Sequence, residues 1–152
     1  MAERIDLTPT PRLLGVVGKI PLKGWQCIAE LLDNSIDAMI QKQEDSKQKN
    51  EIRITLPSNS EMDNNVPLIV SDNGIGMTKS QLKDALTAGL SGKTSDSDLG
   101  LFGMGFNIAT ARVSKSTTVW TSVDDADEDI GVEINIPEMI QTRSFSRDLI
   151  VR

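Results

Sequence analysis

The chain has 152 residues, a net charge of −6 and 38% hydrophobic residues, which fits one soluble globular domain rather than a disordered segment. Histidine is absent and Cys27 is the single cysteine, which excludes His-dependent catalysis, His-ligated metals and an internal disulfide within this chain. The negative charge argues against direct nucleic-acid binding. No apolar run approaches the roughly 20 residues of a membrane span, and no signal-peptide pattern opens the chain. We therefore expect a cytoplasmic protein without membrane contact.

The N-terminal part of the chain combines an irregular segment with a long amphipathic helix. Residues 1–23 are predicted to be irregular because three prolines interrupt any long element. A helix is predicted from Gly24 to about Gln43, since apolar residues recur at spacings of three and four. These residues are Trp25, Ile28, Leu32, Ile36 and Met39.

The rest of the chain alternates short strands with helices. Strands are predicted from period-two alternation or short apolar runs, at residues 51–56, 66–71, 116–123 and 131–136. Helices are predicted at residues 79–88 and 106–113, and residues 89–99, rich in Gly, Ser, Thr and Asp, form a loop between them. This order indicates an α+β fold with helices layered on one sheet.

A polar stripe runs along the first long helix. At 100° per residue, Glu30, Asn34 and Asp37 fall within one arc of about 60°. A carboxylate one turn from a carboxamide suits Mg²⁺ chemistry, because the amide oxygen can ligate the ion and the carboxylate can take a proton from water. A solvated polar face explains the stripe equally well.

A second motif, Asp72-Asn-Gly-Ile-Gly-Met77, follows an apolar strand. A carboxylate at a strand end can accept a hydrogen bond from the amine of adenine, and Gly74 and Gly76 allow a close approach of the backbone to a flat base. Ile75 and Met77 can supply apolar contacts to the ring. The alternative is an ordinary turn, since Asp-Asn-Gly is a common turn sequence.

A third motif is the glycine-bearing segment 100–105, which leads directly into a helix. Glycines free backbone N–H groups to face a phosphate, and the helix N-terminus adds partial positive charge. Two other phosphate-binding patterns fail. Gly92-Lys93-Thr94 lacks the earlier glycine of a P-loop, because Thr87 stands at that position. Segment 100–105 has the spacing GxxGxG instead of the GxGxxG of dinucleotide-binding folds.

Taken in order, the three motifs resemble those of the GHKL (Bergerat-fold) ATPase superfamily, which includes Hsp90, MutL and type II topoisomerases. Residues 30–38 are similar to the N-box, residues 72–77 to the adenine-binding DxGxG box, and residues 100–106 to the glycine box that anchors the lid. The resemblance implies a two-layer α/β sandwich with helices on one face of a mixed sheet, and ATP and Mg²⁺ as ligands. It assigns residues 1–152 to one ATP-binding domain, incomplete at its C-terminus, with an N-terminal arm at residues 1–23 and an ATP lid at residues 89–99.

The resemblance also implies roles for individual residues. Glu30 matches the general base that orients the attacking water, and Asn34 matches the Mg²⁺ ligand. Asp72 matches the acceptor of the adenine amine, and Lys93 is a candidate phosphate contact in the lid, with a solvated lysine as the alternative. The nucleotide-binding set comprises Asn34, Asp37, Asp72, Gly74, Gly76, Met77, Lys93, Gly100, Leu101, Phe102, Gly103, Met104 and Gly105.

The expected function is Mg-ATP binding with slow hydrolysis, in an ATP-driven conformational or dimerisation switch. The expected partners are ATP, a second copy in an ATP-dependent homodimer, and a downstream protein or DNA client. A nucleotide sensor or scaffold without hydrolysis remains an alternative, as does a histidine-kinase-type catalytic domain, although Glu30 favours hydrolysis. The N-box is most similar to MutL and topoisomerases, whereas the glycine box is more similar to Hsp90-like and MORC-like ATPases.

One departure from the family pattern concerns a later strand with a Gly-Thr pair, whose threonine supports the adenine-binding aspartate. No such pair occurs before Arg152. Thr117, Thr118 and Thr121 lie on an earlier predicted strand and are expected to be poor substitutes. We therefore expect weak or no turnover by this segment alone.

Overall fold

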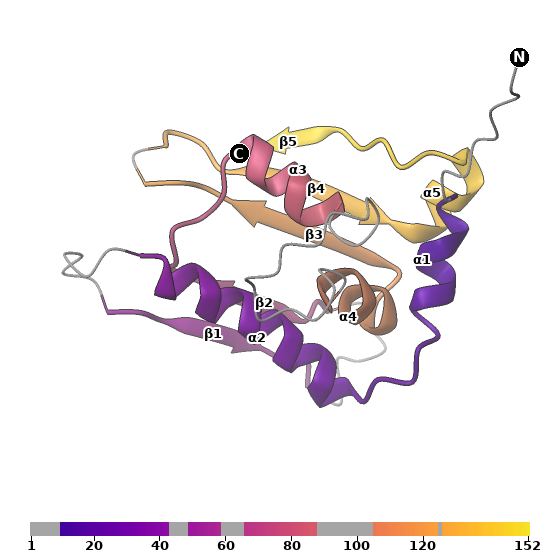
Figure 1. Ribbon diagram of the computed structural model, residues 1–152, viewed down its shortest axis with the longest axis horizontal. Helices are drawn as coiled ribbons and strands as arrows, with labels where there is room; N and C mark the ends of the chain where they lie inside the picture. The colour runs from indigo at the N-terminus through magenta and orange to yellow at the C-terminus, as the bar shows by residue number, and fades with distance from the viewer. Residues whose placement is uncertain (1–9, 43–48, 59–65, 88–104, 125) are drawn as a thin grey trace, which may run out of the picture.

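The computed structural model describes residues 10–42, 49–58, 66–87, 105–124 and 126–152 (Figure 1). Pairs of helices and pairs of strands follow one another along most of the chain, and the α+β class is confirmed. The helices are α1 (Arg12–Val17), α2 (Gly24–Ile40), α3 (Lys79–Thr87), α4 (Gly105–Val113) and α5 (Ile136–Thr142). The strands are β1 (Ile52–Thr55), β2 (Ile69–Asp72), β3 (Ser116–Thr121), β4 (Ile130–Asn135) and β5 (Leu149–Val151).

The strands pair antiparallel in two groups. β1 pairs with β2, with Ile52 opposite Asp72, and β4 pairs with both β3 and β5. The expected single mixed sheet is thus replaced, in the described residues, by two antiparallel groups. The two groups are not joined by a backbone ladder because the chain turns after β2, at Gly76, which has a φ of 65°. Beyond this turn, Met77 contacts the end of β3 through a hydrogen bond to the Thr121 side chain.

The helices α2, α3 and α4 lie on the viewer's side of the strands in Figure 1, and α2 packs against α4 and β2. The buried apolar side chains come from several helices, because each helix turns one apolar face inward. They are Leu14, Cys27, Leu82, Ala109 and Met139. This packing fixes the position of the polar stripe of α2.

The N-terminal segment is not wholly irregular, so that prediction is wrong for residues 12–17. Pro11 stands at the N-cap of α1, where its missing N–H costs no helical hydrogen bond. Leu14 is buried, and a Cβ on Gly18 would lie 2.6 Å from the carbonyl oxygen of Ala111. α1 therefore exists because it packs closely on α4.

The C-terminal part also contains elements that the sequence pattern did not predict. The strand predicted at residues 131–136 ends at Asn135, whose side chain accepts a hydrogen bond from the backbone N–H of Glu138 and caps α5. β5 then adds to β4, with Ile150 opposite Gly131. Among the described residues, no helix is long and apolar enough to cross a membrane.

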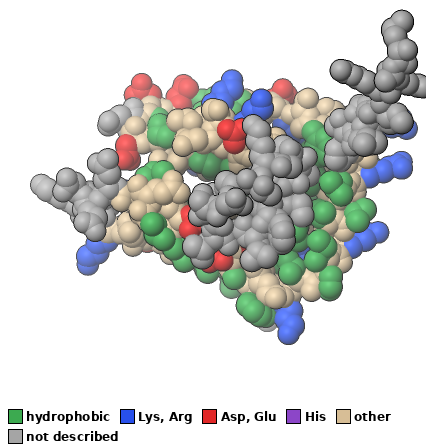
Figure 2. Space-filling view, in the orientation of Figure 1, with side chains coloured by type: hydrophobic (Ala, Val, Ile, Leu, Met, Phe, Trp, Pro, Cys, Tyr) green, Lys and Arg blue, Asp and Glu red, His purple; other side chains and the backbone are tan. Residues whose placement is uncertain are grey.

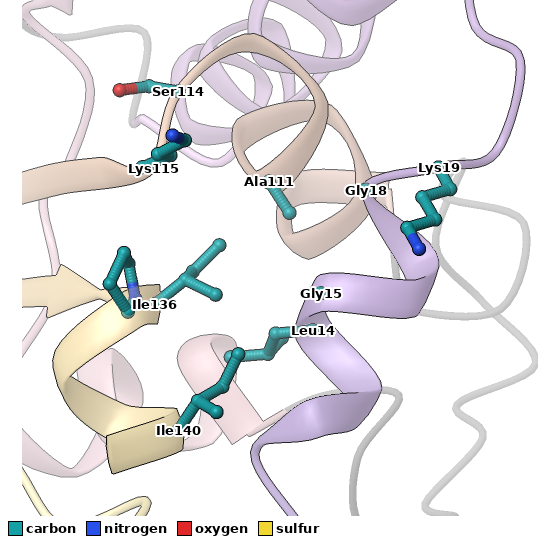
Figure 3. A pocket seen from close by; sticks show the side chains of 10 residues that line it. Leu14, Gly15, Gly18, Lys19, Ala111, Ser114, Lys115, Ile136 and Ile140 are labelled. Carbon is teal, nitrogen blue, oxygen red and sulfur yellow. The ribbon is translucent and has the colours of Figure 1, made fainter.

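A cavity of about 260 Å³ lies between α1, α4 and α5 (Figure 3). Its lining is mainly apolar, including Leu14, Ala111 and Ile140, with Lys19 and Lys115 beside it. Hydrophobic side chains also gather along this edge of the molecule, over α1 and α4 (Figure 2). Among the predicted nucleotide-binding residues that the structure describes, none lines this cavity.

Candidate functional site

Helix α2 carries the predicted acid and amide side chains. Its start is held by one half of a capping box, in which the Gln26 side chain accepts a hydrogen bond of 2.8 Å from the backbone N–H of Lys23. One turn after Glu30, Asn34 Nδ2 donates to the backbone carbonyl of Glu30 at 2.9 Å. This bond uses one of the two N–H donors of the amide and leaves its acceptor oxygen Oδ1 available to a ligand. Asp37 is half-buried one turn further along.

The carboxylate of Glu30 lies against Gly105, the first residue of α4. A Cβ built on Gly105 would collide with Glu30 Oε2, so a larger residue at position 105 would displace the carboxylate. The N-terminus of a helix carries partial positive charge, which favours a carboxylate there. The structure thus brings the predicted base next to the last glycine of the predicted glycine box.

Asp72, the last residue of β2, uses both carboxylate oxygens in hydrogen bonds. Ser35 Oγ donates to Oδ2 at 2.9 Å, and the backbone N–H of Gly74 donates to Oδ1 at 2.9 Å. Ser35 is 5% exposed, whereas Asp72 itself is exposed. Each carboxylate oxygen has a further lone pair. The carboxylate is therefore held in one orientation while it can still accept a hydrogen bond from a ligand.

Ser35 was not predicted as a site residue. It lies on the face of α2 that packs on β2, beside an amide predicted to point to the ligand. The only hint of this role in the local sequence is that a small hydroxyl residue stands among the apolar positions of that helix face. Its partner, Asp72, is 37 residues away in the chain, so the pairing could not be seen without the fold.

Asn73 fixes the loop to the start of β1. Its side chain accepts a hydrogen bond from the backbone N–H of Glu51 at 2.8 Å and donates to the carbonyl of Lys49 at 2.7 Å. Lys42 Nζ donates to the carbonyl of Asn73 at 2.7 Å. Three residues from two parts of the chain therefore hold Asn73, whose local sequence predicted only a turn.

The two glycines of the loop are required by its packing. A Cβ on Gly74 would lie 2.7 Å from the Cβ of Ala38 on α2. Gly76 has a positive φ of 65°, and a Cβ there would collide with the carbonyl of Ser122 after β3. The packing of the loop against α2 and against the end of β3 therefore requires glycine at both positions. The close approach of these glycines to a flat base stays a prediction.

Met77 ends the loop at β3. Its backbone N–H donates to Thr121 Oγ1 at 2.8 Å. Thr121 lies on a strand earlier in the chain than the threonine of the family pattern, and no local signal in the sequence connects it with the loop. β3 nevertheless supplies a threonine hydroxyl to the predicted adenine-binding segment.

Part of the predicted site lies outside the described residues. This part comprises the lid at residues 89–99 with Lys93, and also Gly100, Leu101, Phe102, Gly103 and Met104. The described part gathers around α2, which touches both the Asp72 loop and the start of α4. It comprises Glu30, Asn34, Asp37, Asp72, Gly74, Gly76, Met77 and Gly105.

The donor set around α2 suits a cation that is shared with a ligand. No group of three or more acidic or cysteine side chains that could hold a metal occurs in the described parts of the chain. Mg²⁺ is usually bound by one or two protein oxygens together with phosphates and water. The oxygen of Asn34 can serve as one such ligand, and the bond from its nitrogen to the helix backbone orients the amide group.

Comparison with known proteins gives a match to a family model and matches to plant proteins. A family model described as "Histidine kinase-, DNA gyrase B-, and HSP90-like ATPase" matches residues 22–144. Proteins MICRORCHIDIA 1, 2 and 3 of Arabidopsis thaliana are each 33% identical to the chain over 94 residues. These residues cover 62% of this chain but 14%, 14% and 15% of the respective relatives. The match therefore spans about one seventh of the length of these relatives.

Proposed function

The chain belongs to the family of histidine kinase-, DNA gyrase B- and HSP90-like ATPases, and on that premise we propose that it binds Mg-ATP where the Asp72 loop and α4 meet α2. The observation that carries the proposal is the carboxylate of Asp72, which is oriented by Ser35 and Gly74 yet remains exposed. Such a carboxylate can accept a hydrogen bond from the amine of adenine and discriminates against a base that presents an oxygen there.

The polar stripe of α2 supports a role at the phosphates. Asn34 Oδ1 is the ligand proposed for Mg²⁺, which supplies charge stabilisation to the phosphates when it is bound. Glu30 is proposed to orient water and to accept its proton during attack on the γ-phosphate. Its carboxylate stands at the N-terminus of α4, beside Gly105, so the base and the end of the glycine box face the same region.

Hydrolysis is favoured over transfer of the phosphoryl group to histidine. The chain contains no histidine that could accept it, and a carboxylate is present at position 30 to serve as the base for water. We propose that hydrolysis is slow and that ATP acts as a conformational switch that promotes pairing of two copies. A downstream protein or DNA client would then be engaged by other parts of the protein, since the matched region is a small share of the relatives.

Isothermal titration of the chain with ATP in the presence of Mg²⁺ tests the binding step. We expect saturable binding of ATP that weakens when EDTA removes Mg²⁺, because the phosphates then lose their counter-charge. GTP serves as the control nucleotide, since its base presents an oxygen to Asp72 and should bind more weakly. Heat signals that do not saturate with ATP would contradict the proposal.

The Glu30→Ala variant tests the hydrolysis step. It should bind ATP with near wild-type affinity and hydrolyse it about 10²–10⁴-fold more slowly in single-turnover assays, the usual contribution of a general base. Asp33→Ala is a matched control, because Asp33 is an exposed carboxylate on the same helix. Wild-type turnover by Glu30→Ala would exclude the base role. Binding without turnover in the wild type would instead favour the nucleotide sensor without hydrolysis.

A further inference from the structure

The hydrogen bond between Met77 and Thr121 joins the Asp72 loop to a strand that carries no recognised motif. Thr121 is the last residue of β3 and is half-buried, and its Oγ1 accepts the backbone N–H of Met77 at 2.8 Å. A backbone N–H shielded from water needs a partner. The hydroxyl of Thr121 is that partner, so the end of the loop depends on a side chain from β3.

The neighbouring residues reinforce this connection. Gly76 has the left-handed conformation and lies against the carbonyl of Ser122, which directly follows Thr121. Two successive residues of the loop therefore touch two successive residues at the end of β3. A shift of β3 along its axis would have to break the hydrogen bond between Met77 and Thr121 or move Gly76, because both contacts are close.

The strand itself is held in register. Thr121 pairs with Ile130 of β4. Asp129, directly before Ile130, exchanges backbone hydrogen bonds of 3.0 and 3.1 Å with Arg152, directly after β5. β3 is thus the edge of a paired three-strand unit. A loop attached to its end acquires a fixed position relative to Asp72.

We propose that Thr121 is a positioning residue for base recognition, which sets the distance and angle between Asp72 and the Met77 end of the loop. This inference rests on the proposed binding of ATP and names a residue that acts through the backbone of Met77. Without the hydroxyl, the Met77 N–H turns toward water and the loop samples other conformations. Binding of adenine then has to restore the ordered loop, which weakens affinity.

The test compares three variants of the full chain. Thr121→Val keeps the shape but loses the acceptor, Thr121→Ser keeps the acceptor, and Thr118→Val makes the same change at an exposed position of β3 on its opposite face. We expect Thr121→Val to weaken ATP binding by roughly tenfold, because binding then has to restore the ordered loop. GTP affinity should stay nearly constant, so that the ATP-to-GTP ratio falls, while Thr121→Ser and Thr118→Val retain the wild-type ratio.

Amide hydrogen exchange, followed by NMR without nucleotide, gives a readout that does not depend on ATP. The N–H of Met77 should be protected in the wild type and in Thr121→Ser, and unprotected in Thr121→Val. Fast exchange of this amide in the wild type would overturn the inference even if Thr121→Val failed to fold. An unchanged ATP-to-GTP ratio in folded Thr121→Val would overturn it too. Absence of ATP binding by the wild type, with Met77 still protected, is the distinct failure of the proposed function itself.

Discussion

The two ends of the Asp72–Met77 loop are held in different ways. The first end is anchored to α2, where Ser35 donates to Asp72 and Ala38 packs on Gly74. The second end is anchored to β3, where Thr121 accepts the N–H of Met77 from 44 residues away. Both partners of the first anchor belong to recognisable motifs, whereas the partner of the second lies in an ordinary strand. The sequence motifs therefore account for the anchor at the Asp72 end of the loop and not for the anchor at its Met77 end.

The largest expected effect is at the first end of the loop. Asp72→Asn replaces one accepting oxygen by an N–H₂ group. This donor would face another donor, either the Ser35 hydroxyl or Gly74 N–H, or the amine of adenine. ATP binding should weaken by about 100-fold or more, the loss typical of a hydrogen bond to a charged group together with an unmatched donor. Calorimetry measures this loss. Unchanged ATP affinity would end the assignment of Asp72 to adenine.

The next effect concerns the second end. Gly76→Ala introduces a Cβ at a positive φ and against the carbonyl of Ser122, so the free energy of unfolding should fall by about 2 kcal/mol. Urea denaturation measures the change. Gly24→Ala is the matched control, because a Cβ there meets nothing within 4 Å. Equal stability of the two variants would show that the contact between Gly76 and Ser122 is not tight.

A smaller effect is expected when the first anchor is weakened without changing Asp72. Ser35→Ala removes the hydroxyl that donates to Asp72 Oδ2, and water can replace it because Asp72 is exposed. The free energy of unfolding should fall by about 1 kcal/mol, with a moderate loss of ATP affinity. Ser80→Ala, at an exposed position of α3, should leave both unchanged. If Ser35→Ala bound ATP with the same affinity as the wild type, Gly74 alone would be sufficient to orient Asp72.

The smallest expected effect is a pH dependence of stability at Asp129, which lies next to the β4 residue that pairs with Thr121. The hydrogen bond from Arg152, with a further one from Ser122, lowers the pKa of the Asp129 carboxyl in the folded chain. A lowered pKa stabilises the fold above the unfolded pKa of about 3.9, and this contribution disappears as the pH falls through the lower folded value. The pair is solvent-exposed, so the change is small.

Thermal unfolding followed between pH 6 and 3 measures this dependence. The decline of Tm on acidification should be slightly less steep in Asp129→Asn than in the wild type, because the variant lacks the titrating group. Asp124→Asn, an exposed carboxylate in the same turn region, serves as the comparison. A steeper decline in Asp129→Asn would mean that the ion pair with Arg152 does not stabilise the folded chain.

The sequence by itself determined the long helix α2, the helices α3 and α4, the strands β1 to β4 and the α+β class. These elements carry apolar residues at the local periods of a helix or a strand, which can be read without knowing their partners. The stripe of Glu30, Asn34 and Asp37 was equally predictable, since helical geometry alone puts these residues on one side. The order of three motifs gave the family.

Only the tertiary structure decided the short elements and the supports of the site. α1, α5 and β5 are too short to show a period, and they form because Leu14, Met139 and Gly131 have partners elsewhere in the fold. The roles of Ser35, Asn73 and Thr121 arise from hydrogen bonds between residues 22 to 44 positions apart. Local pattern cannot encode such pairings, because they depend on how separate elements pack after the chain has folded.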